Sequence, residues 1–303
     1  SMSVTSAPDR ILTEGLAQIQ REIDATFDAL LPMPQDPRTR LVEAMRYATI
    51  GGGKRVRPLL LAATADMYGV DRNMAVRTGI AIEAVHVYSL IHDDLPCMDN
   101  DDLRHGKPTL HKAFDEATAV LAGDALHCFA FEILSDPALS GDPFIRAELI
   151  QTLAMAAGMN GMAGGQMMDI VAETTDFDLH TVTRLQQLKT GALLAAAVEM
   201  GAVLGKVPHE GRGHLRAYAR DIGLAFQIAD DLLDHEGDEQ AAGKALRKDA
   251  GAGKQTFVSL LGAQRARDQA RALVDQAISH LAQHGAEADL LRALARYIVE
   301  RNH

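Results

Sequence analysis

The 303-residue chain is 47% hydrophobic and 23% charged, an ordinary globular balance that can fill a sizeable core. Only 4% of its residues are aromatic and none is Trp, which favours helix-on-helix packing over sheets. A formal net charge of −11 argues against a protein that binds duplex nucleic acid, because neutralising phosphates needs Lys and Arg at the surface.

Apolar residues recur at helical spacing along most of the chain, whereas the alternation typical of strands is hard to find. We predict helices separated by glycine and proline breaks, at residues 10–31, 38–50, 55–68, 73–95, 109–135, 143–159, 178–206, 211–236, 254–284 and 286–301. No linker or repeat divides the chain, so one all-α domain is expected over residues 10–303. Residues 1–9, which begin with a serine before the first methionine, are expected to be a tag remnant and an N-terminal tail.

Cysteine content and apolar runs indicate the compartment. Cys97 and Cys128 are too few for a disulfide framework, which predicts a reducing, cytoplasmic location. The longest apolar run, residues 192–204, is short and contains Glu199, so we expect no membrane span.

The segment 51–58, Gly-Gly-Gly-Lys-Arg-Val-Arg-Pro, leads into a predicted helix whose first turn would contain Pro58. The amides and the dipole of a helix N-terminus favour an anion, and Lys54 and Arg57 add positive charge. The segment is not a Walker A loop, because no Ser or Thr follows the lysine.

A first acidic cluster follows the apolar helix predicted at 73–95. Asp93 and Asp99 would not share a face of a continuous helix, but Pro96 favours a bend that would bring them together. Carboxylates this close repel one another unless a cation lies between them, so we favour a metal site over a solvated helix end. His86 lies two turns before Asp93 on nearly the same face, and we interpret it as a ligand rather than a core histidine.

A second acidic cluster, Asp230-Asp231-Leu232-Leu233-Asp234, follows another apolar stretch. Its outer carboxylates stand at i and i+4 on one helix face, where like charges cost stability unless they are compensated. Mg²⁺ with phosphate oxygens is the natural compensation. Two such clusters together predict a polynuclear Mg²⁺ site that faces a diphosphate.

Two other segments carry basic residues that suit such a site. The segment 189–191, Lys-Thr-Gly, would be a simple helix break in another context. The glycine-rich and basic stretch 237–253 interrupts the helical pattern and leaves two interpretations open. It is either a mobile surface loop or a cationic lid over an anionic ligand.

These segments together resemble the motifs of the trans-prenyl diphosphate synthases, most closely those of the bacterial type of farnesyl diphosphate synthase. The matching motifs are residues 52–58 (GGKRVRP), 93–99 (DDLPCMD), 103–109 (LRHGKPT), 189–191 (KTG) and 226–234 (FQIADDLLD). Any one of them is weak evidence, but the combination in this order is highly specific. The resemblance implies an isoprenoid synthase-like helical bundle around a deep central cavity, and a homodimer.

The resemblance also implies a metal site built from both acidic clusters. Asp93, Asp99 and Asp230 would contact Mg²⁺, and Asp94 and Asp234 would help directly or through water. Three Mg²⁺ ions in each active site are implied, with Mn²⁺ as a possible substitute.

The remaining candidate residues are assigned to substrates by the same resemblance. Arg104, Lys189 and Lys244 would hold the allylic diphosphate, and Lys54, Arg57 and His86 would hold isopentenyl diphosphate. Thr190 and Gln227 would lie near the carbocation, and further substrate-binding candidates are Gly53, His105 and Lys254. Tyr88 and Ser89, just before the first acidic cluster, would limit the product to farnesyl diphosphate.

The implied reaction joins dimethylallyl or geranyl diphosphate to isopentenyl diphosphate. The basic residues and Mg²⁺ would stabilise the leaving diphosphate, the isopentenyl double bond would attack the allylic cation, and the diphosphate would take the released proton. No Ser/His/Asp or Cys/His arrangement is then needed.

Two positions depart from the family pattern. His105 stands where the family has the second of two adjacent arginines, which predicts weaker or pH-sensitive binding of isopentenyl diphosphate. Arg247 and Lys248 stand in the stretch 237–253 where small residues are usual.

Three alternatives remain at this point. The same chemistry carried further would give a geranylgeranyl diphosphate synthase. The pair His92-Asp93, preceded by His86, also fits a metal phosphohydrolase of the HD type, although it gives the second acidic cluster no purpose. A non-catalytic subunit is a third reading, against which the intact second cluster argues.

Overall fold

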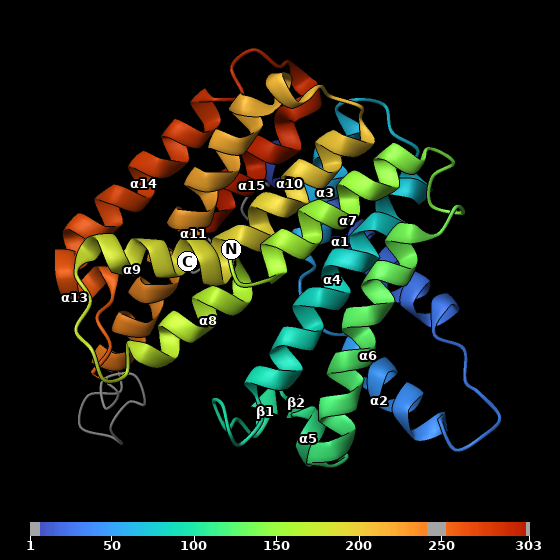
Figure 1. Ribbon diagram of the computed structural model, residues 1–303. Coiled ribbons are helices and arrows are strands. Elements are labelled where there is room, and N and C mark those ends of the chain that lie inside the picture. The colour runs from blue at the N-terminus through green and yellow to red at the C-terminus, as the bar shows by residue number, and fades with distance from the viewer. Residues whose placement is uncertain (1–6, 241–252, 301–303) are drawn as a thin grey trace, which may run out of the picture. The chain divides into compact units, whose positions relative to one another are not determined.

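The computed structural model describes residues 7–240 and 253–300, and this part of the chain is almost entirely helical (Figure 1). In chain order the elements are α1 (Ala7–Leu30), α2 (Thr39–Thr49), α3 (Val56–Asp66), α4 (Arg72–Asp93), β1 (Leu103–Arg104), β2 (Lys107–Pro108), α5 (Leu110–Ala113), α6 (Glu116–Ser135), α7 (Pro143–Ala157), α8 (Met162–Val171), α9 (Leu179–Gln186), the π-helical turn η1 (Gln187–Gly191), α10 (Ala192–Leu204), η2 (His209–Arg212), α11 (Gly213–Gln240), α13 (Phe257–Leu261), α14 (Ala263–Ser279), η3 (Ala286–Ala288) and α15 (Asp289–Glu300). The predicted all-α fold class is confirmed.

Internal contacts divide the chain into two compact units. Unit 1 comprises the described parts of Ser1–Leu12, Thr152–Glu199 and Val207–His303. Unit 2 comprises Thr13–Gln151 and Met200–Lys206. The two acidic clusters belong to different units, the first to unit 2 and the second to unit 1.

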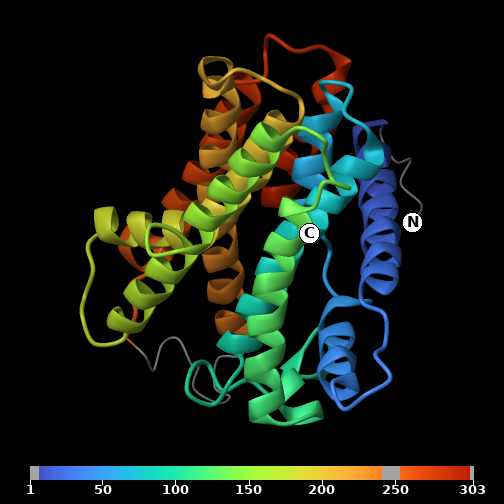
Figure 2. The ribbon, with the colours of Figure 1, turned by 45° about the vertical axis from the view of Figure 1, so that its right-hand side comes forward.

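Helix α4 is the central element of unit 2. It begins where the Asp71 side chain accepts a hydrogen bond from the amide of Met74, a typical N-cap. It packs against α3 and α6, and α6 also packs against α2 (Figure 2). Most of its residues between Ala75 and Ile91 are buried, so packing fixes the position of the helix that ends at Asp93.

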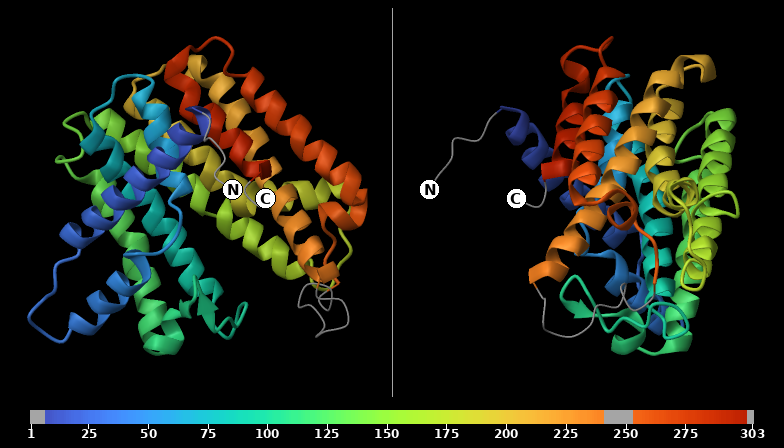
Figure 3. Two further views of the ribbon diagram at one scale, coloured as in Figure 1. Left: turned by 180° about the vertical axis from the view of Figure 1, so that it is seen from behind. Right: turned by 90° about the vertical axis from the view of Figure 1, so that its left-hand side faces the viewer.

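Helix α11 has the corresponding position in unit 1. It packs against α14, α15 and the π-helical turn (Figure 3). Tyr218 on α11 is fully buried, and its hydroxyl donates a hydrogen bond of 2.6 Å to the carbonyl of Leu291 at the start of α15. This packing fixes the helix that carries Asp230 and Asp234.

The observed elements differ from the predicted ones in several places. The helix predicted at 254–284 is divided into α13 and α14, because Gly262 between them has a positive φ of 83°. The helix predicted at 109–135 is divided into α5 and α6, because Asp115 takes an extended conformation and caps α6 through the amide of Thr118. Helix α8 was not predicted. A two-stranded antiparallel hairpin, the only sheet in the described residues, follows the first acidic cluster and was not predicted either.

Three helical stretches are long and apolar enough to cross a membrane by length and composition alone, namely Arg72–Asp93, Glu116–Ser135 and Leu179–Leu204. The sequence analysis missed them because it considered only uninterrupted apolar runs. Between 44% and 67% of their most apolar windows is buried within the protein, so packing accounts for much of the apolar character.

Candidate active site

The first acidic cluster lies in a tight turn at the end of α4. The amide of Asp99 donates to the carbonyl of Asp93 at 2.8 Å, and the amide of Asp101 donates to the carbonyl of Asp94 at 3.1 Å. Asn100 has a positive φ of 53°, which helps to close the turn. The bend predicted at Pro96 is therefore present, and it brings the backbone of Asp99 back beside Asp93.

Asp94 and Arg104 form a two-pronged ion pair at the entrance of the hairpin. Arg104 Nε donates to Asp94 Oδ2 at 2.8 Å, and its Nη2 donates to Oδ1 at 2.6 Å. Asp94 is only 2% exposed, and its hydrogen bond raises the pKa of Arg104 above the ordinary value. The sequence analysis gave these residues to different ligands, whereas here each one orients the other.

A pocket of unit 2 opens beside this pair. Its lining includes Gly52, Gly53, Arg55, His86, Arg104 and His105. It brings together candidates from the segment 51–58, from α4 and from the hairpin, which are far apart in the sequence.

The pKa values of two histidines that line this pocket are lowered. Burial and the neighbouring Arg57, Arg104 and Arg55 hold the pKa of His86 well below its usual range, so its imidazole is neutral. Partial burial and nearby cations also lower the pKa of His105. Cations contribute to both shifts, and the pocket lining contains the cations Arg55, Arg104 and Lys107 against the carboxylates Glu83 and Asp94, a small excess of positive charge that suits an anion.

The neutral His86 has a definite partner. Its Nε2 lies 3.4 Å from Arg57 Nη1. A guanidinium has only donors, so His86 Nε2 is the acceptor and its proton resides on Nδ1. His86 therefore orients Arg57 and adds no charge of its own.

The π-helical turn η1 of unit 1 holds the segment 189–191. Lys189 Nζ lies 2.8 Å from Asp169 Oδ2 on α8, and Lys254 Nζ lies 3.2 Å from the same oxygen. Burial would raise the pKa of Asp169, but the two lysines outweigh it and hold the pKa below its usual range. A Cβ on Gly165 would collide with the backbone of Lys189, so only glycine lets α8 approach this closely.

The second acidic cluster lies on α11, which also contacts η1. Asp230 and Asp234 lie within this continuous helix, so the predicted i, i+4 relation on one face is confirmed. Gln227 is 9% exposed. Asp231 Oδ2 accepts the amide of Phe257 at 3.0 Å and so anchors the start of α13.

Tyr88 contacts aromatic groups on α4 and α6. Its ring stacks on His127 with the centroids 4.7 Å apart and the planes at 2°, and it meets the edge of His92 at 5.6 Å. Burial, then Asp93 and Asp124, raise the pKa of Tyr88. The Tyr88 ring is thus held between side chains of two packed helices.

Several residues of these sites were not predicted. Asp169, His127 and the two carboxylates that bind Arg55 (Glu83 and Asp24) are isolated in the sequence, and no spacing rule singles them out. Only their partners, far away in the sequence, give them a role. Lys244, Arg247 and Lys248 lie outside the described residues.

The carboxylates suit a hard divalent cation, because Mg²⁺ prefers carboxylate oxygens. Asp93 and Asp99 in unit 2, and Asp230 and Asp234 in unit 1, offer such donors. In residues 7–240 and 253–300, no group of three or more His, Cys, Asp or Glu forms a ready-made metal site.

Comparison with known proteins decides the family. The family model for polyprenyl synthetase matches residues 38–297. The chain belongs to the polyprenyl synthetase family. It is 46% identical over 283 residues to the farnesyl diphosphate synthase of Escherichia coli K12, covering 91% of this chain and 93% of that protein. It is 44% identical over 294 residues to that of Haemophilus influenzae, covering 95% and 98%.

Two solved structures agree with this assignment. An FPP/GFPP synthase from Zymomonas mobilis is 60% identical, with a TM-score of 0.88 and coverage of 95% of this chain and 98% of that one. A geranyltransferase from Legionella pneumophila is 32% identical, with a TM-score of 0.86 and coverage of 96% and 97%. This chain is accordingly a prenyltransferase.

The structure shows how His92, the first residue of the His92-Asp93 pair, packs. His92 Nε2 lies 3.1 Å from the carbonyl of Val120 on α6. A Cβ on Gly123 would collide with the His92 ring, so the imidazole packs closely over α6. His92 thus joins two helices.

Proposed function

We propose that this polyprenyl synthetase condenses isopentenyl diphosphate with dimethylallyl or geranyl diphosphate and releases farnesyl diphosphate. The observation that carries the proposal is the pocket of unit 2, which is lined by His86 and Arg104 beside the first acidic cluster and in which His86 contacts Arg57. The pocket suits a diphosphate, and the names of the relatives from Escherichia coli and Haemophilus influenzae supply the product.

The two units supply different parts of the reaction. Lys54, Arg57 and His86 of unit 2 bind the diphosphate of the isopentenyl substrate. Lys189 of unit 1, with Lys244, binds the diphosphate of the allylic substrate, and Thr190 and Gln227 line the position of the cation. The family resemblance supports a reaction in which the residues of both units take part.

The chemistry needs no dedicated nucleophile on the protein. The allylic C–O bond breaks and its electron pair leaves with the diphosphate, whose charge Lys189 stabilises. The isopentenyl double bond forms the new C–C bond, and the released diphosphate accepts the proton that is lost. The protein binds and orients the two substrates and excludes water from them.

Mg²⁺ is the metal we propose, held by Asp93, Asp99, Asp230 and Asp234, with Asp94 assisting. Membership of the polyprenyl synthetase family supports a dependence on divalent metal ions. When bound, Mg²⁺ would neutralise the diphosphate that leaves. We propose three such ions, with Mn²⁺ as a substitute.

The test is a product assay with isopentenyl diphosphate and each allylic primer. Activity should need Mg²⁺ or Mn²⁺, and Asp93→Ala or Asp230→Ala should lower kcat by roughly 10³-fold while the fold is retained. Asp275→Ala, which removes an exposed carboxylate of α14, is the control and should leave kcat unchanged. Full activity in excess chelator would overturn the metal assignment.

Product length is a second question, because the relative from Zymomonas mobilis is named for two products, FPP and GFPP. We propose that Tyr88, held by its stack on His127, is the floor that stops growth, with Ser89 beside it. Tyr88→Ala should therefore give products longer than farnesyl diphosphate, measured by chromatography of the folded variant. Clean termination at farnesyl diphosphate in this variant would exclude Tyr88 as the floor.

The protein is proposed to act as a homodimer in the cytoplasm, without a membrane span or nucleic-acid partner and with its synthase domain over residues 10–303. Apolar side chains exposed on α6 and α7, such as Leu121 and Phe144, support association with a second copy. Light scattering would measure the oligomeric state.

A further inference from the structure

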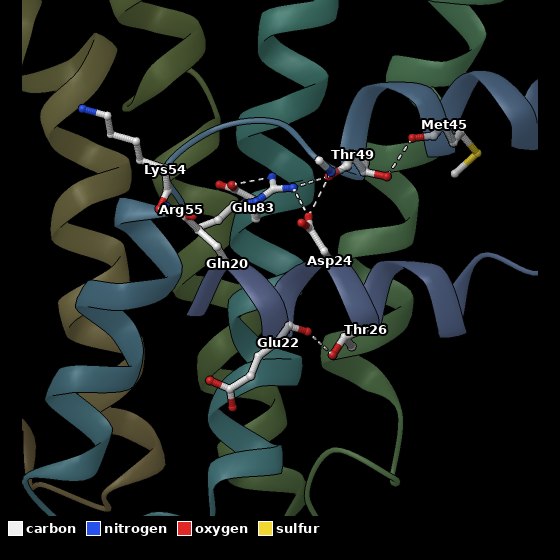
Figure 4. Close-up of polar contacts among 10 residues, drawn as sticks. Gln20, Glu22, Asp24, Thr26, Met45, Thr49, Lys54, Arg55 and Glu83 are labelled. Carbon is white, nitrogen blue, oxygen red and sulfur yellow. Dashed lines mark hydrogen bonds and ion pairs between the residues drawn. The ribbon is translucent and has the colours of Figure 1, made fainter. Parts of the chain in front are cut away.

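Arg55 is the most completely enclosed cation of unit 2 and carries the further inference. It is 3% exposed. Its Nη1 donates to Glu83 Oε2 at 2.8 Å, and its Nη2 donates to Asp24 Oδ1 at 2.9 Å and to the carbonyl of Thr49. Figure 4 shows these groups converging on the guanidinium from α1, α4 and the end of α2.

The backbone around Arg55 needs such an anchor. Gly51 has a φ of 80° and Arg55 itself a φ of 66°, a left-handed conformation that is costly for a residue with a side chain. Asp24 Oδ1 also accepts the amide of Gly51 at 3.0 Å. Gln20 Nε2 donates to the carbonyl of Lys54 at 3.3 Å. The segment 51–55 is therefore fastened to α1 near both of its ends.

The same contacts align the segment with α4. Glu83 and His86 are three residues apart on α4, so they lie on the same face of the helix. Glu83 binds Arg55, and His86 contacts Arg57, two residues farther along. Two neighbouring residues of α4 thus hold two arginines on either side of the α3 N-terminus.

Arg55 itself is a poor ligand for an anion, although it lines the pocket. Two carboxylates and a carbonyl already occupy both of its terminal nitrogens. Its Nε is sealed from solvent and has no hydrogen-bond partner, so this donor is not offered to the pocket. The Lys54 side chain, in contrast, extends away from the cluster (Figure 4).

We propose that Arg55, Glu83 and Asp24 form a positioning device that fixes Lys54 and Arg57 for binding of isopentenyl diphosphate, without touching that substrate. The inference rests on the proposed function, since it names which substrate the pocket of unit 2 receives. A displacement of Lys54 or Arg57 by a fraction of an ångström would weaken the binding of isopentenyl diphosphate and leave the binding of the allylic substrate unaffected.

The direction in which one substitution changes anion binding distinguishes a positioning role from a purely electrostatic one. Glu83 lines the pocket, so removing its charge by Glu83→Gln should strengthen anion binding if only the local charge matters. If Glu83 holds Arg55 in place, the same change should weaken binding. Glu83→Gln keeps the size of the side chain, and Asp24→Asn makes the equivalent change on α1.

The experiment measures KM for isopentenyl diphosphate, KM for geranyl diphosphate, kcat and the melting temperature. Glu83→Gln should raise KM for isopentenyl diphosphate about tenfold and leave KM for geranyl diphosphate within about twofold. Asp24→Asn should change KM in the same direction by less. The matched control is Glu22→Gln, two residues away on α1, whose carboxylate binds Arg72 at 2.7 Å and 3.0 Å. It should lower the melting temperature without changing either KM.

Each outcome has a definite meaning. An unchanged or lower KM for isopentenyl diphosphate in folded Glu83→Gln and Asp24→Asn would overturn the positioning role. Equal changes in both KM values would show that the cluster is a general structural element, and this result would also overturn the positioning role. If Lys54→Ala and Arg57→Ala also leave this KM unchanged, the proposed function of the pocket fails instead.

Discussion

Two cationic clusters, one in each unit, differ in how closely carboxylates surround their cations. In unit 2 the single guanidinium of Arg55 meets the carboxylates of Glu83 and Asp24. In unit 1 the ammonium groups of Lys189 and Lys254 share the carboxylate of Asp169, and the half-exposed Glu173 lies farther away, 3.9 Å from Lys254 Nζ. The first cluster has two close carboxylates for one cation, whereas the second has one close carboxylate for two cations.

This difference separates cations that hold the protein together from cations that receive a ligand. A buried cation matched by carboxylates is stable without substrate, and removing a partner costs folding free energy. Cations that share one close carboxylate are less fully neutralised, so we expect part of the charge of Lys189 and Lys254 to be available to a diphosphate. We therefore expect mutations in the Arg55 cluster to affect mainly stability and geometry, and mutations at Lys189 to affect mainly catalysis.

The largest effect is expected at the cluster of Lys189 and Lys254. Lys189→Ala should lower kcat by roughly 10²- to 10³-fold, because a cation is lost where charge develops on the leaving diphosphate. Its melting temperature should change little. The control is Lys206→Ala, at an exposed position outside both clusters, which should keep full activity. A large loss of stability in Lys189→Ala with normal kcat would reverse the comparison.

The next effect concerns stability in the Arg55 cluster. Glu83→Gln should lower the free energy of unfolding by about 3 kcal/mol, because Arg55 loses a fully buried partner. Glu22→Gln, which disturbs a partly exposed ion pair with Arg72, should cost only about 1 kcal/mol. Denaturant unfolding measures both values. Equal costs for the two variants would show that burial does not distinguish these ion pairs.

The smallest effect is expected at His105, at the edge of the pocket. Because burial and nearby cations lower its pKa below the ordinary 6.5, His105 is neutral at and above about pH 6.5. His105→Arg would add charge there and lower KM for isopentenyl diphosphate by about threefold. The difference should disappear as the pH falls through the pKa of His105, where the wild-type imidazole also becomes charged. A difference that does not depend on pH would mean that charge is not the cause.

Local sequence signals predicted much of the fold. Helical periodicity located most of the long helices, and Pro96 correctly predicted the turn that returns Asp99 to Asp93. Helix α8 was missed because Gly164 and Gly165 weaken the helical pattern, although Gly165 is what allows the close contact with Lys189. Gly165 is unfavourable for the local helical pattern but is required for a tertiary contact.

The candidate site was predictable only where its residues form motifs. The spacing of the carboxylates singled out the two acidic clusters, and the family resemblance supplied the roles proposed for residues in 52–58, 93–99 and 226–234. The role of Arg55 was not predictable, because its partners Glu83 and Asp24 lie 28 and 31 residues away and belong to no motif. Pairings of this kind depend on how helices pack, which hydrophobic periodicity does not encode.

The π-helical turn η1 changes the rotation of α10 about the helix axis relative to α9. An α-helix advances by about 100° for each residue, so one extra residue rotates everything that follows relative to what precedes. Deleting one residue from Gln187–Gly191 would restore a regular helix but turn Lys189 and Thr190 away from α8 and α11 if α10 kept its packing. Such a deletion would be silent in a helix-content measurement and severe in an activity assay. The extra residue therefore lets α10 keep its buried face while Lys189 and Thr190 of the turn face α8 and α11.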